Sequence, residues 1–419
     1  MTPRGARAVL AAAGVLLAAP AAARDLWTQG ERSLALRTSL KASLLLSHAP
    51  EDPLLFPERD GAASFWRLRL EPEARLGKAV TVVLAYEQRL RVSSQSSPLS
   101  GLSALPAETP APYRVRSLDW RLSESGGYSW RHELDRGYLA LHLPNANITV
   151  GRQAVGWGRG VLFGAVDLFA PFSPLEADRE WRRGVDAVRA DLKLAKRVSI
   201  DAVAAFGRST NTSVFAARLR GYAGKVDLEL VGGRRARDLF AGVTSSAAVG
   251  DAAIHGELAV FRAPEALVAG GLGDGRTAVK AVAGSSYRFS LGSGLLVFLE
   301  YHYSGFGVKH AEDILPLLAE PGFQERYLRG DTQILGRHAI AMLASYEVSP
   351  ELSLTVQWLQ SPVDGSGVLT PSATVTFGDK VSLLATAHVP YGRSPRGGTL
   401  RSEYGAAARS GFVQIRIYE

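Results

Sequence analysis

The feature that most constrains the fold is a strict two-residue alternation, seen most clearly in the segment SFWRLRLEPEARLG at positions 64–77. One parity holds the apolar residues Trp66, Leu68, Leu70, Pro72, Ala74 and Leu76, and the other holds the charged residues Arg67, Arg69, Glu71, Glu73 and Arg75. A helix would scatter these charges around its axis, whereas a strand collects them on one face. A secreted sandwich or solenoid is the alternative, but its core would not place such a charged row opposite a purely apolar one.

The same alternation recurs along the chain in about eighteen segments. The connections between them alternate between tight turns, such as PNAN and FGDK, and long loops. Short turns on one rim, long loops on the other and an even strand count are typical of an outer-membrane barrel. The predicted fold is therefore all-β: a transmembrane antiparallel β-barrel of about 18 strands (about 16 to 20), with short periplasmic turns and long extracellular loops.

The first 23 residues indicate export. Arg4 and Arg7 precede an apolar run at 9–19, and alanines occupy positions 21–23, as in a cleaved secretory signal. A membrane anchor is the competing interpretation, but the run is shorter than the ~20 residues that a spanning helix needs. We expect residues 1–23 to be removed, leaving 24–419 as one barrel domain. The chain has no cysteine, which excludes disulfides and thiolate metal sites.

The charged parity carries an excess of cations, and the whole chain has a formal net charge of +8. The cations predicted to line a pore are Arg37, Lys41, Arg67, Arg69, Arg75, Arg89, Arg91, Arg218 and Arg220. Such a row would raise the local concentration of anions, as charged rings do in selective pores. The alternative is that these side chains pair with Glu71, Glu73 and Glu87 on neighbouring strands and only brace the wall.

An enzyme would need a nucleophile or metal site, and the sequence offers little for either. The candidate histidines are His132, His255, His302, His338 and His388, and His302 follows Glu300 on the same predicted strand face, where the two could orient one another. Neither a G-x-S-x-G elbow nor an H-E-x-x-H motif occurs. We therefore predict no enzyme activity, no metal and no cofactor, with a hydrolase at the outer rim as the less favoured alternative.

The segment 133–194 contains Gly-Arg-Gln at 151–153, Trp-Gly at 157–158 and Asp-Leu-Phe-Ala-Pro at 167–171. This run resembles the GRQ, WG and DxFxP pattern of porin-like bacterial outer-membrane barrels, which are broadly similar to alginate-export-type barrels. The resemblance implies that residues 154–183 form a long loop folded into the lumen. The constriction residues that it implies are Arg152, Gln153, Trp157, Arg159, Asp167 and Phe169. The alternative is a loop that plugs and braces the barrel without contacting solute. The glycines do not form a phosphate-binding P-loop, since the Lys-Ser/Thr end is missing.

These patterns together predict an outer-membrane channel for passive passage of small hydrophilic, anionic solutes. Its expected partners are outer-membrane lipid, lipopolysaccharide and the solutes themselves, not nucleic acid. A monomer and a trimer both remain open. The second hypothesis is a barrel that sheathes or anchors a partner protein without transport.

Overall fold

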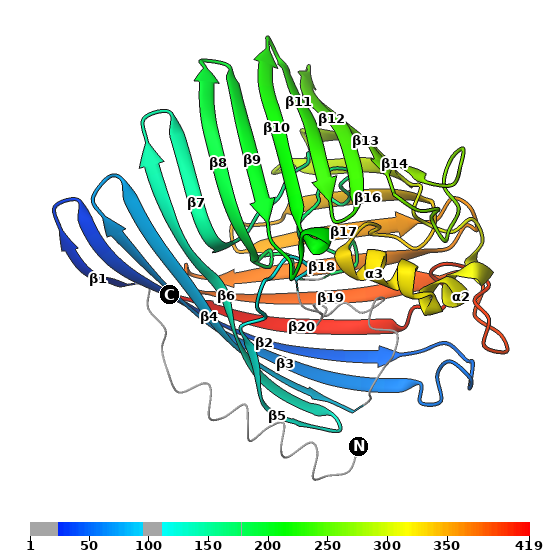
Figure 1. Cartoon of the computed structure of the whole chain (residues 1–419). Helices are drawn as coiled ribbons and strands as arrows, with labels where there is room; N and C mark the ends of the chain where they lie inside the picture. The colour runs from blue at the N-terminus through cyan, green and yellow to red at the C-terminus, as the bar shows by residue number, and fades with distance from the viewer. Residues whose placement is uncertain (1–23, 95–110, 177) are drawn as a thin grey trace.

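The computed structural model describes residues 24–94, 111–176 and 178–419, so the predicted signal at 1–23 lies outside the described residues. The chain forms one closed antiparallel barrel of 18 strands, as predicted (Figure 1). Each strand pairs with the next along the chain, and the last strand pairs with the first to close the ring. Closure satisfies the backbone hydrogen bonds of every strand and leaves no open edge.

The strands of the ring are β2 (Arg32–His48), β3 (Asp60–Leu76), β4 (Val80–Ser93), β6 (Tyr128–Leu143), β7 (Ala146–Gln153), β8 (Val185–Ala195), β9 (Val198–Ala205), β10 (Val214–Ala223), β11 (Val226–Arg235), β12 (Asp238–Val249), β13 (Ala252–Arg262), β14 (Thr277–Phe289), β15 (Leu295–Ser304), β16 (His338–Glu347), β17 (Leu352–Gln360), β18 (Gly367–Phe377), β19 (Val381–Tyr391) and β20 (Arg409–Tyr418).

Two short strands, which the alternation did not predict, lie beside the ring. β1 (Arg24–Gln29) pairs with the first residues of β2, and β5 (Asp119–Ser125) pairs with the first residues of β6. Each pairs with one strand only. β5 lies in a connection that the sequence predicts as a loop, and seven residues carry too little alternation to identify it.

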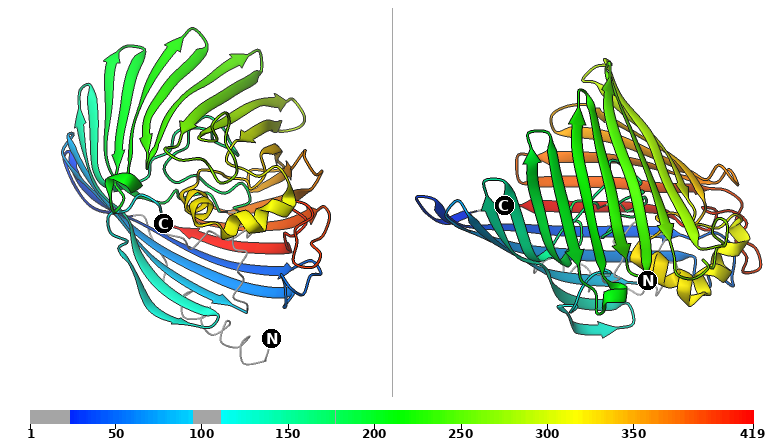
Figure 2. Two further views of the ribbon diagram at one scale, coloured as in Figure 1. Left: turned by 45° about the vertical axis from the view of Figure 1, so that its right-hand side comes forward. Right: turned by 45° about the horizontal axis from the view of Figure 1, so that its top comes forward.

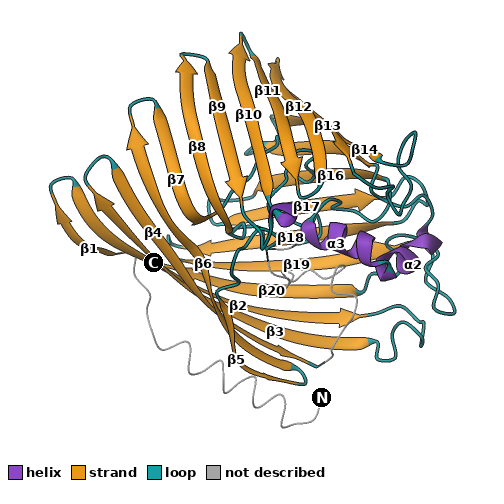
Figure 3. Cartoon of the chain, viewed as in Figure 1, coloured by secondary structure: helices purple, strands orange, loops and turns teal. Residues whose placement is uncertain are grey.

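The two rims differ as predicted. Tight hairpin turns join the strands at one rim, with glycines in the left-handed region, such as Gly224 (φ 63°) and Gly250 (φ 61°). Long connections crowd the opposite rim, and Figure 2 and Figure 3 show the helices there. These helices are η2 (Thr210–Thr212), η3 (Ala311–Asp313), α2 (Ile314–Ala319) and α3 (Pro321–Arg329). In the part of the chain that the structure describes, no helix is long and apolar enough to span a bilayer.

The helices α2 and α3 lie in a connection for which the sequence analysis proposed no regular structure. Local signals for α3 were present: Pro321 begins the helix, Arg326 and Arg329 occupy its last turn, and Gly330 follows in the left-handed conformation. The helices pack on the connection before β20 through an apolar cluster that includes Ile314 and Leu400. That long-range contact explains why so short a helical segment is stable.

The wall has an apolar outer face and a polar inner face. Large apolar side chains are exposed all around the outside; examples are Leu84, Leu139, Leu230, Leu258 and Ile415. Residues of the opposite parity are buried; examples are Lys41, Arg69, Glu87, Arg218, Glu229 and Glu300. A lipid-facing apolar belt and a polar interior are what a membrane-spanning barrel requires.

Candidate functional site

Residues 154–176 and 178–184, between β7 and β8, lie inside the ring of strands (Figure 2). The first half of this segment contacts polar residues on the inner faces of β9, β11, β13 and β15. The second half contacts β17, β20 and β2. Because these strands surround the lumen, we call residues 154–176 and 178–184 the inner segment.

Two carboxylates and an amide bind the backbone of the inner segment. Every backbone N–H from residue 159 to residue 166 donates to one of three side chains. Glu257 accepts from residues 160 and 165 at 2.9 and 2.6 Å, and also from residues 159 and 166. Glu300 accepts from residues 161, 162 and 163 at 2.5, 2.9 and 3.2 Å. Gln333 accepts from residue 164 at 2.8 Å.

The glycines of the GWGRG run allow this close approach. Gly158 has φ 110°, and a Cβ there would lie 2.9 Å from a carboxylate oxygen of Glu257. A Cβ on Gly160 would lie 1.9 Å from the carbonyl oxygen of Phe163. Amides arranged in this way form a concavity for an anion. In this protein the anions are its own carboxylates, Glu257 and Glu300, which explains why the sequence superficially resembles a phosphate loop.

Four of the predicted constriction residues hold the inner segment to the wall and to itself. Trp157 donates to Asp201 of β9 at 3.0 Å, and Phe169 packs edge-on against Trp157 with ring centroids 5.1 Å apart. Arg159 pairs with Glu229 at 3.0 Å and also with Asp227, both on β11. Asp167 pairs with Arg182 of the same segment at 2.7 Å. Whether these residues narrow a solute path stays a prediction.

The other two, Arg152 and Gln153, end β7 and bind the neighbouring backbone. Arg152 pairs with Asp186 at 2.7 Å and donates to the carbonyl oxygen of Leu134 at 2.9 Å. Gln153 donates to the carbonyl oxygen of Ala187 at 3.1 Å. Both side chains therefore fix the point where the inner segment leaves the wall.

The predicted wall cations of β2 to β4 lie among carboxylates. Lys41 contacts Asp178 and Glu180 of the inner segment at 2.7 and 2.8 Å, and its ammonium lies 3.8 Å from the ring centroid of Trp181. Glu87 is the common partner on the wall, and its ion pairs are with Arg67 at 3.7 Å, Arg89 at 2.6 Å and Arg69. Arg91, on the same strand as Arg89, also has an interaction partner.

The remaining wall cations are paired too. Arg218 pairs with Asp201 and Glu229 at 3.1 and 3.3 Å, and Arg220 pairs with Asp191 at 2.5 Å. Arg37 and Arg75 both pair with Glu73, and their side chains are more than half exposed near the turn rim. These contacts agree with the alternative that the wall cations pair with carboxylates and brace the wall. A count of cations on the inner face therefore overstates the positive charge that is free of a carboxylate partner.

Glu300 and His302, the pair considered for hydrolysis, take part in packing the inner segment. Glu300 binds the amides described above and His255 Nε2 at 2.9 Å. His302 is buried and stacks on Phe163, with ring centroids 4.9 Å apart. Among the residues that the structure describes, no group of three histidine or acidic side chains could hold a metal ion.

The inner segment leaves a cavity of about 210 Å³ against the inner faces of β16 to β19. The wall side of this cavity is lined by Leu343, Thr355, Gln357, Thr370, Ser372, Leu384, Thr386 and His388. Glu176 and Arg179 line the side formed by the inner segment. None of these wall residues is among those predicted to line the pore, because the prediction relied on formal charge and, apart from the histidine, these side chains carry none. We call this space the β16–β19 cavity.

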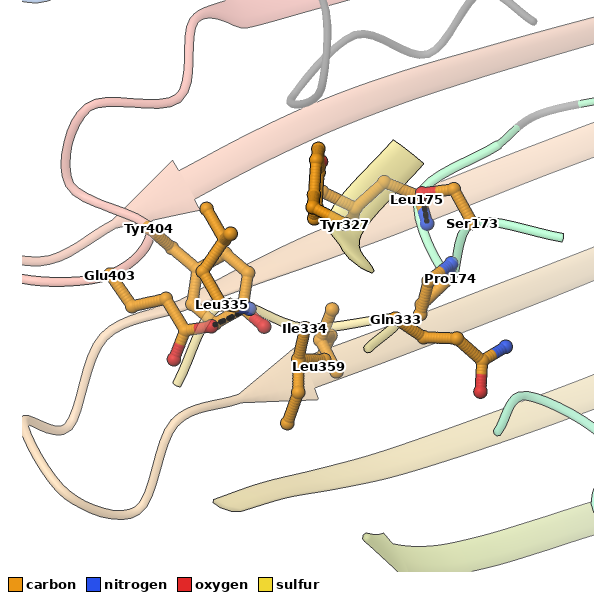
Figure 4. Close-up of a pocket in the computed structure, with 10 residues that line it drawn as sticks. All are labelled: Ser173, Pro174, Leu175, Tyr327, Gln333, Ile334, Leu335, Leu359, Glu403 and Tyr404. Atoms are coloured by element: carbon orange, nitrogen blue, oxygen red, sulfur yellow. Dashed lines mark hydrogen bonds between the residues drawn. The ribbon is translucent and has the colours of Figure 1, made fainter. Parts of the chain in front are cut away.

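A buried carboxyl joins two long connections at the helical rim (Figure 4). Glu403, before β20, accepts hydrogen bonds from the amides of Leu335 and Gly336 at 3.1 and 2.7 Å. Burial, reinforced by the nearby charge of Asp364, raises the pKa of Glu403 to about 7. The side chain is therefore close to its titration point at neutral pH.

We expect the attachment of these two connections to weaken as the pH rises from about 4.5 to about 7. Because the pKa of Glu403 in the folded protein lies above the ordinary value of 4.5, its stabilising contribution is fully present below pH 4.5 and is lost as the pH rises to the pKa of the folded state. The loss should reach about 3 kcal/mol near pH 7 and change little at higher pH. Hydrogen exchange at the amides of residues 335 and 336, corrected for the intrinsic exchange rates, measures this loss of stabilisation. Glu403→Gln keeps an acceptor oxygen and should abolish the pH dependence; an equal dependence in the variant would contradict this origin.

The closed ring, the apolar outer face and the inner segment define a barrel of the outer-membrane porin type. No family model matches the sequence, and no curated protein matches it. Solved structures do match. OccAB1 of Acinetobacter baumannii has a TM-score of 0.57 at 11% identity, covering 95% of this chain and 99% of its own. OccAB4 of the same organism has a TM-score of 0.54 at 11% identity, covering 94% and 99%.

OccD3 (OpdP) of Pseudomonas aeruginosa has a TM-score of 0.51 at 9% identity, covering 96% of this chain and 95% of its own. These neighbours are outer-membrane porins, and at such low identity they show that the fold is shared. The resemblance to barrels with the GRQ, WG and DxFxP pattern and the likeness to alginate-export-type barrels stay predictions.

Proposed function

We propose that the protein is an outer-membrane channel for passive passage of small hydrophilic solutes, with anions favoured. The observation that carries the proposal is the pairing of an exposed apolar outer face with a polar inner face in a closed ring. The inner segment lies across this lumen and leaves the β16–β19 cavity, lined by both apolar and polar side chains, beside it. In the proposal, residues 1–23 are removed on export, lipid and lipopolysaccharide contact the outer face, and the inner segment narrows the path.

Two observations favour a channel over the alternatives. The lumen is occupied by the protein's own inner segment, which contacts strands around the ring, so a sheath for a partner protein would have little room. The Glu300 and His302 pair is engaged in packing that segment, so the rim hydrolase lacks its expected site.

The test is conductance of the purified, refolded protein in a planar bilayer under a KCl gradient. The proposal predicts discrete conductance steps and a reversal potential that shows preference for chloride. Heat-modifiable migration in gels would establish that the sample is folded. A folded protein that gives no steps would contradict the channel, and preference for potassium would contradict the anionic part alone.

A further inference from the structure

The β16–β19 cavity differs in chemistry from the rest of the inner wall. Elsewhere, on β2 to β4 and on β9 to β11, cations and carboxylates pair closely. Along this cavity the wall offers the hydroxyls of Thr355, Ser372 and Thr386 and the amide of Gln357. These groups donate and accept hydrogen bonds without carrying charge. Ser372 and Thr386 share a hydrogen bond at 3.0 Å, and Gln357 donates to the carbonyl oxygen of Pro174 at 2.8 Å, so these groups have neutral partners. A hydrophilic solute would meet hydroxyl and amide groups here that are not held in an ion pair.

Arg179 is the cation that faces this cavity. Its guanidinium donates to the carbonyl oxygens of Glu176 and Pro174 and lies 3.5 Å from the amide oxygen of Gln357. Among the described residues, no carboxylate lies within ion-pair distance of Arg179. Lys41 and Arg182, which contact neighbouring parts of the inner segment, both have such partners. Glu176 and Glu300 lie close enough to attract the guanidinium electrostatically, but neither forms an ion pair with it, and its hydrogen bonds go to neutral acceptors.

Glu176 is the acidic group at the same cavity. Its carboxylate accepts a hydrogen bond from the amide of Ser173 at 3.4 Å and makes no ion pair with Arg179. Burial raises the pKa of Glu176, which favours its neutral form relative to an exposed glutamate. The group therefore opposes the charge of Arg179 less than an exposed carboxylate would. It adds a further hydrogen-bonding partner to the cavity lining.

We propose that the β16–β19 cavity is a solute-binding site of the channel and that Arg179 is its specificity-determining residue. Arg179 binds the anionic group of a small polyhydroxylated solute, while Gln357 and the wall hydroxyls bind its hydroxyl groups. This inference rests on the proposed channel function. It assigns the selectivity for anions to Arg179 of the inner segment and not to the wall arginines, which are ion-paired. The volume of about 210 Å³ is below the ~300 Å³ of sites for drug-sized ligands, which fits a small solute.

Gluconate and glucose are suitable probes, since both are small polyhydroxylated molecules and only gluconate carries an anionic group. Single-channel current through the full mature chain in KCl would be recorded while either compound is added. Wild type should show concentration-dependent interruption of current by gluconate and much weaker interruption by glucose. Arg179→Gln should weaken the apparent affinity for gluconate about tenfold or more, because a charge-assisted hydrogen bond is lost. Its effect on glucose should be small.

Arg237→Gln is the matched control, because it removes a positive charge from an exposed ion pair with Glu265 at the rim. It should behave as wild type toward both probes. Thr386→Val keeps the shape of the wall and removes one hydroxyl, so both probes should bind severalfold more weakly. This variant also tests the site if Arg179→Gln does not fold.

The outcomes separate the two proposals. Failure of folded wild type to conduct at all would overturn the channel itself. Conducting variants at Arg179 and Thr386 that respond to gluconate as wild type does would overturn the binding site and leave the channel standing. Equal interruption of wild-type current by gluconate and glucose would overturn the role of Arg179 alone.

Discussion

Removal of residues 159–175, with a short glycine-serine linker in their place, is expected to raise single-channel conductance several-fold. These residues cross the lumen and contact β11, β13, β15 and β17. The sequence interpretation counted Arg152 and Gln153 among the constriction residues. The deletion begins beyond them, because both side chains hold the ends of the neighbouring strands. Single-channel recording in KCl measures the change.

The control for this deletion is a shortening of the connection between β13 and β14, by removal of residues 265–274 at the rim. Asp274 of that connection forms an exposed ion pair with Arg262 at the end of β13. The rim deletion should leave conductance near the wild-type value. If removal of 159–175 also leaves it unchanged in a folded barrel, the inner segment does not limit the path.

The second large effect is expected from replacing the carboxylates that bind the inner segment. Glu257→Leu or Glu300→Leu leaves several amides of residues 159–166 without acceptors in a buried setting. Each lost hydrogen bond to a charged group is worth about 1.5 to 3 kcal/mol, so the free energy of unfolding should fall by about 3 kcal/mol or more. Current through the variants should also become noisy, as the freed segment moves within the lumen.

Urea unfolding followed by tryptophan fluorescence, together with single-channel recording, measures both consequences. Glu300→Gln keeps one acceptor oxygen and should lose less stability than Glu300→Leu. Glu265→Gln, at an exposed rim position, should change stability by less than about 1 kcal/mol. Leucine variants as stable and as quiet as wild type would show that the amide contacts do not hold the segment.

The wall of the barrel could be predicted because its signal is local. Alternation of side chains along one strand reports which face meets lipid, and the tight turns report which strands are neighbours. β5 was missed because it is short and pairs with a single strand. The anchoring of the inner segment was missed for a different reason, since Glu257 and Glu300 lie far along the chain from the amides that they bind.

The net charge of the lumen could not be predicted for the same reason, because ion-pair partners lie far apart in the sequence. Counting cations on the inner parity predicted a surplus on the first strands, including Lys41 and Arg69. Their partners, Asp178 on the inner segment and Asp135 on β6, are identified only when the chain is folded. Arg179 lies within a charged stretch of the sequence, and the sequence does not show which cation of that stretch lacks an ion-pair partner. Its lack of a carboxylate partner in the described chain is a property of the packing.

The central claim is that solute passes between the inner segment and β16 to β19, and thiol modification tests it most directly. The chain has no cysteine, so Thr386→Cys introduces a single thiol at the β16–β19 cavity. A negatively charged methanethiosulfonate reagent should then lower conductance in a discrete step that a reducing agent reverses. Leu258→Cys, on the exposed outer face, should show no step. Modification of Thr386→Cys, verified by mass, without any change in conductance would contradict the account.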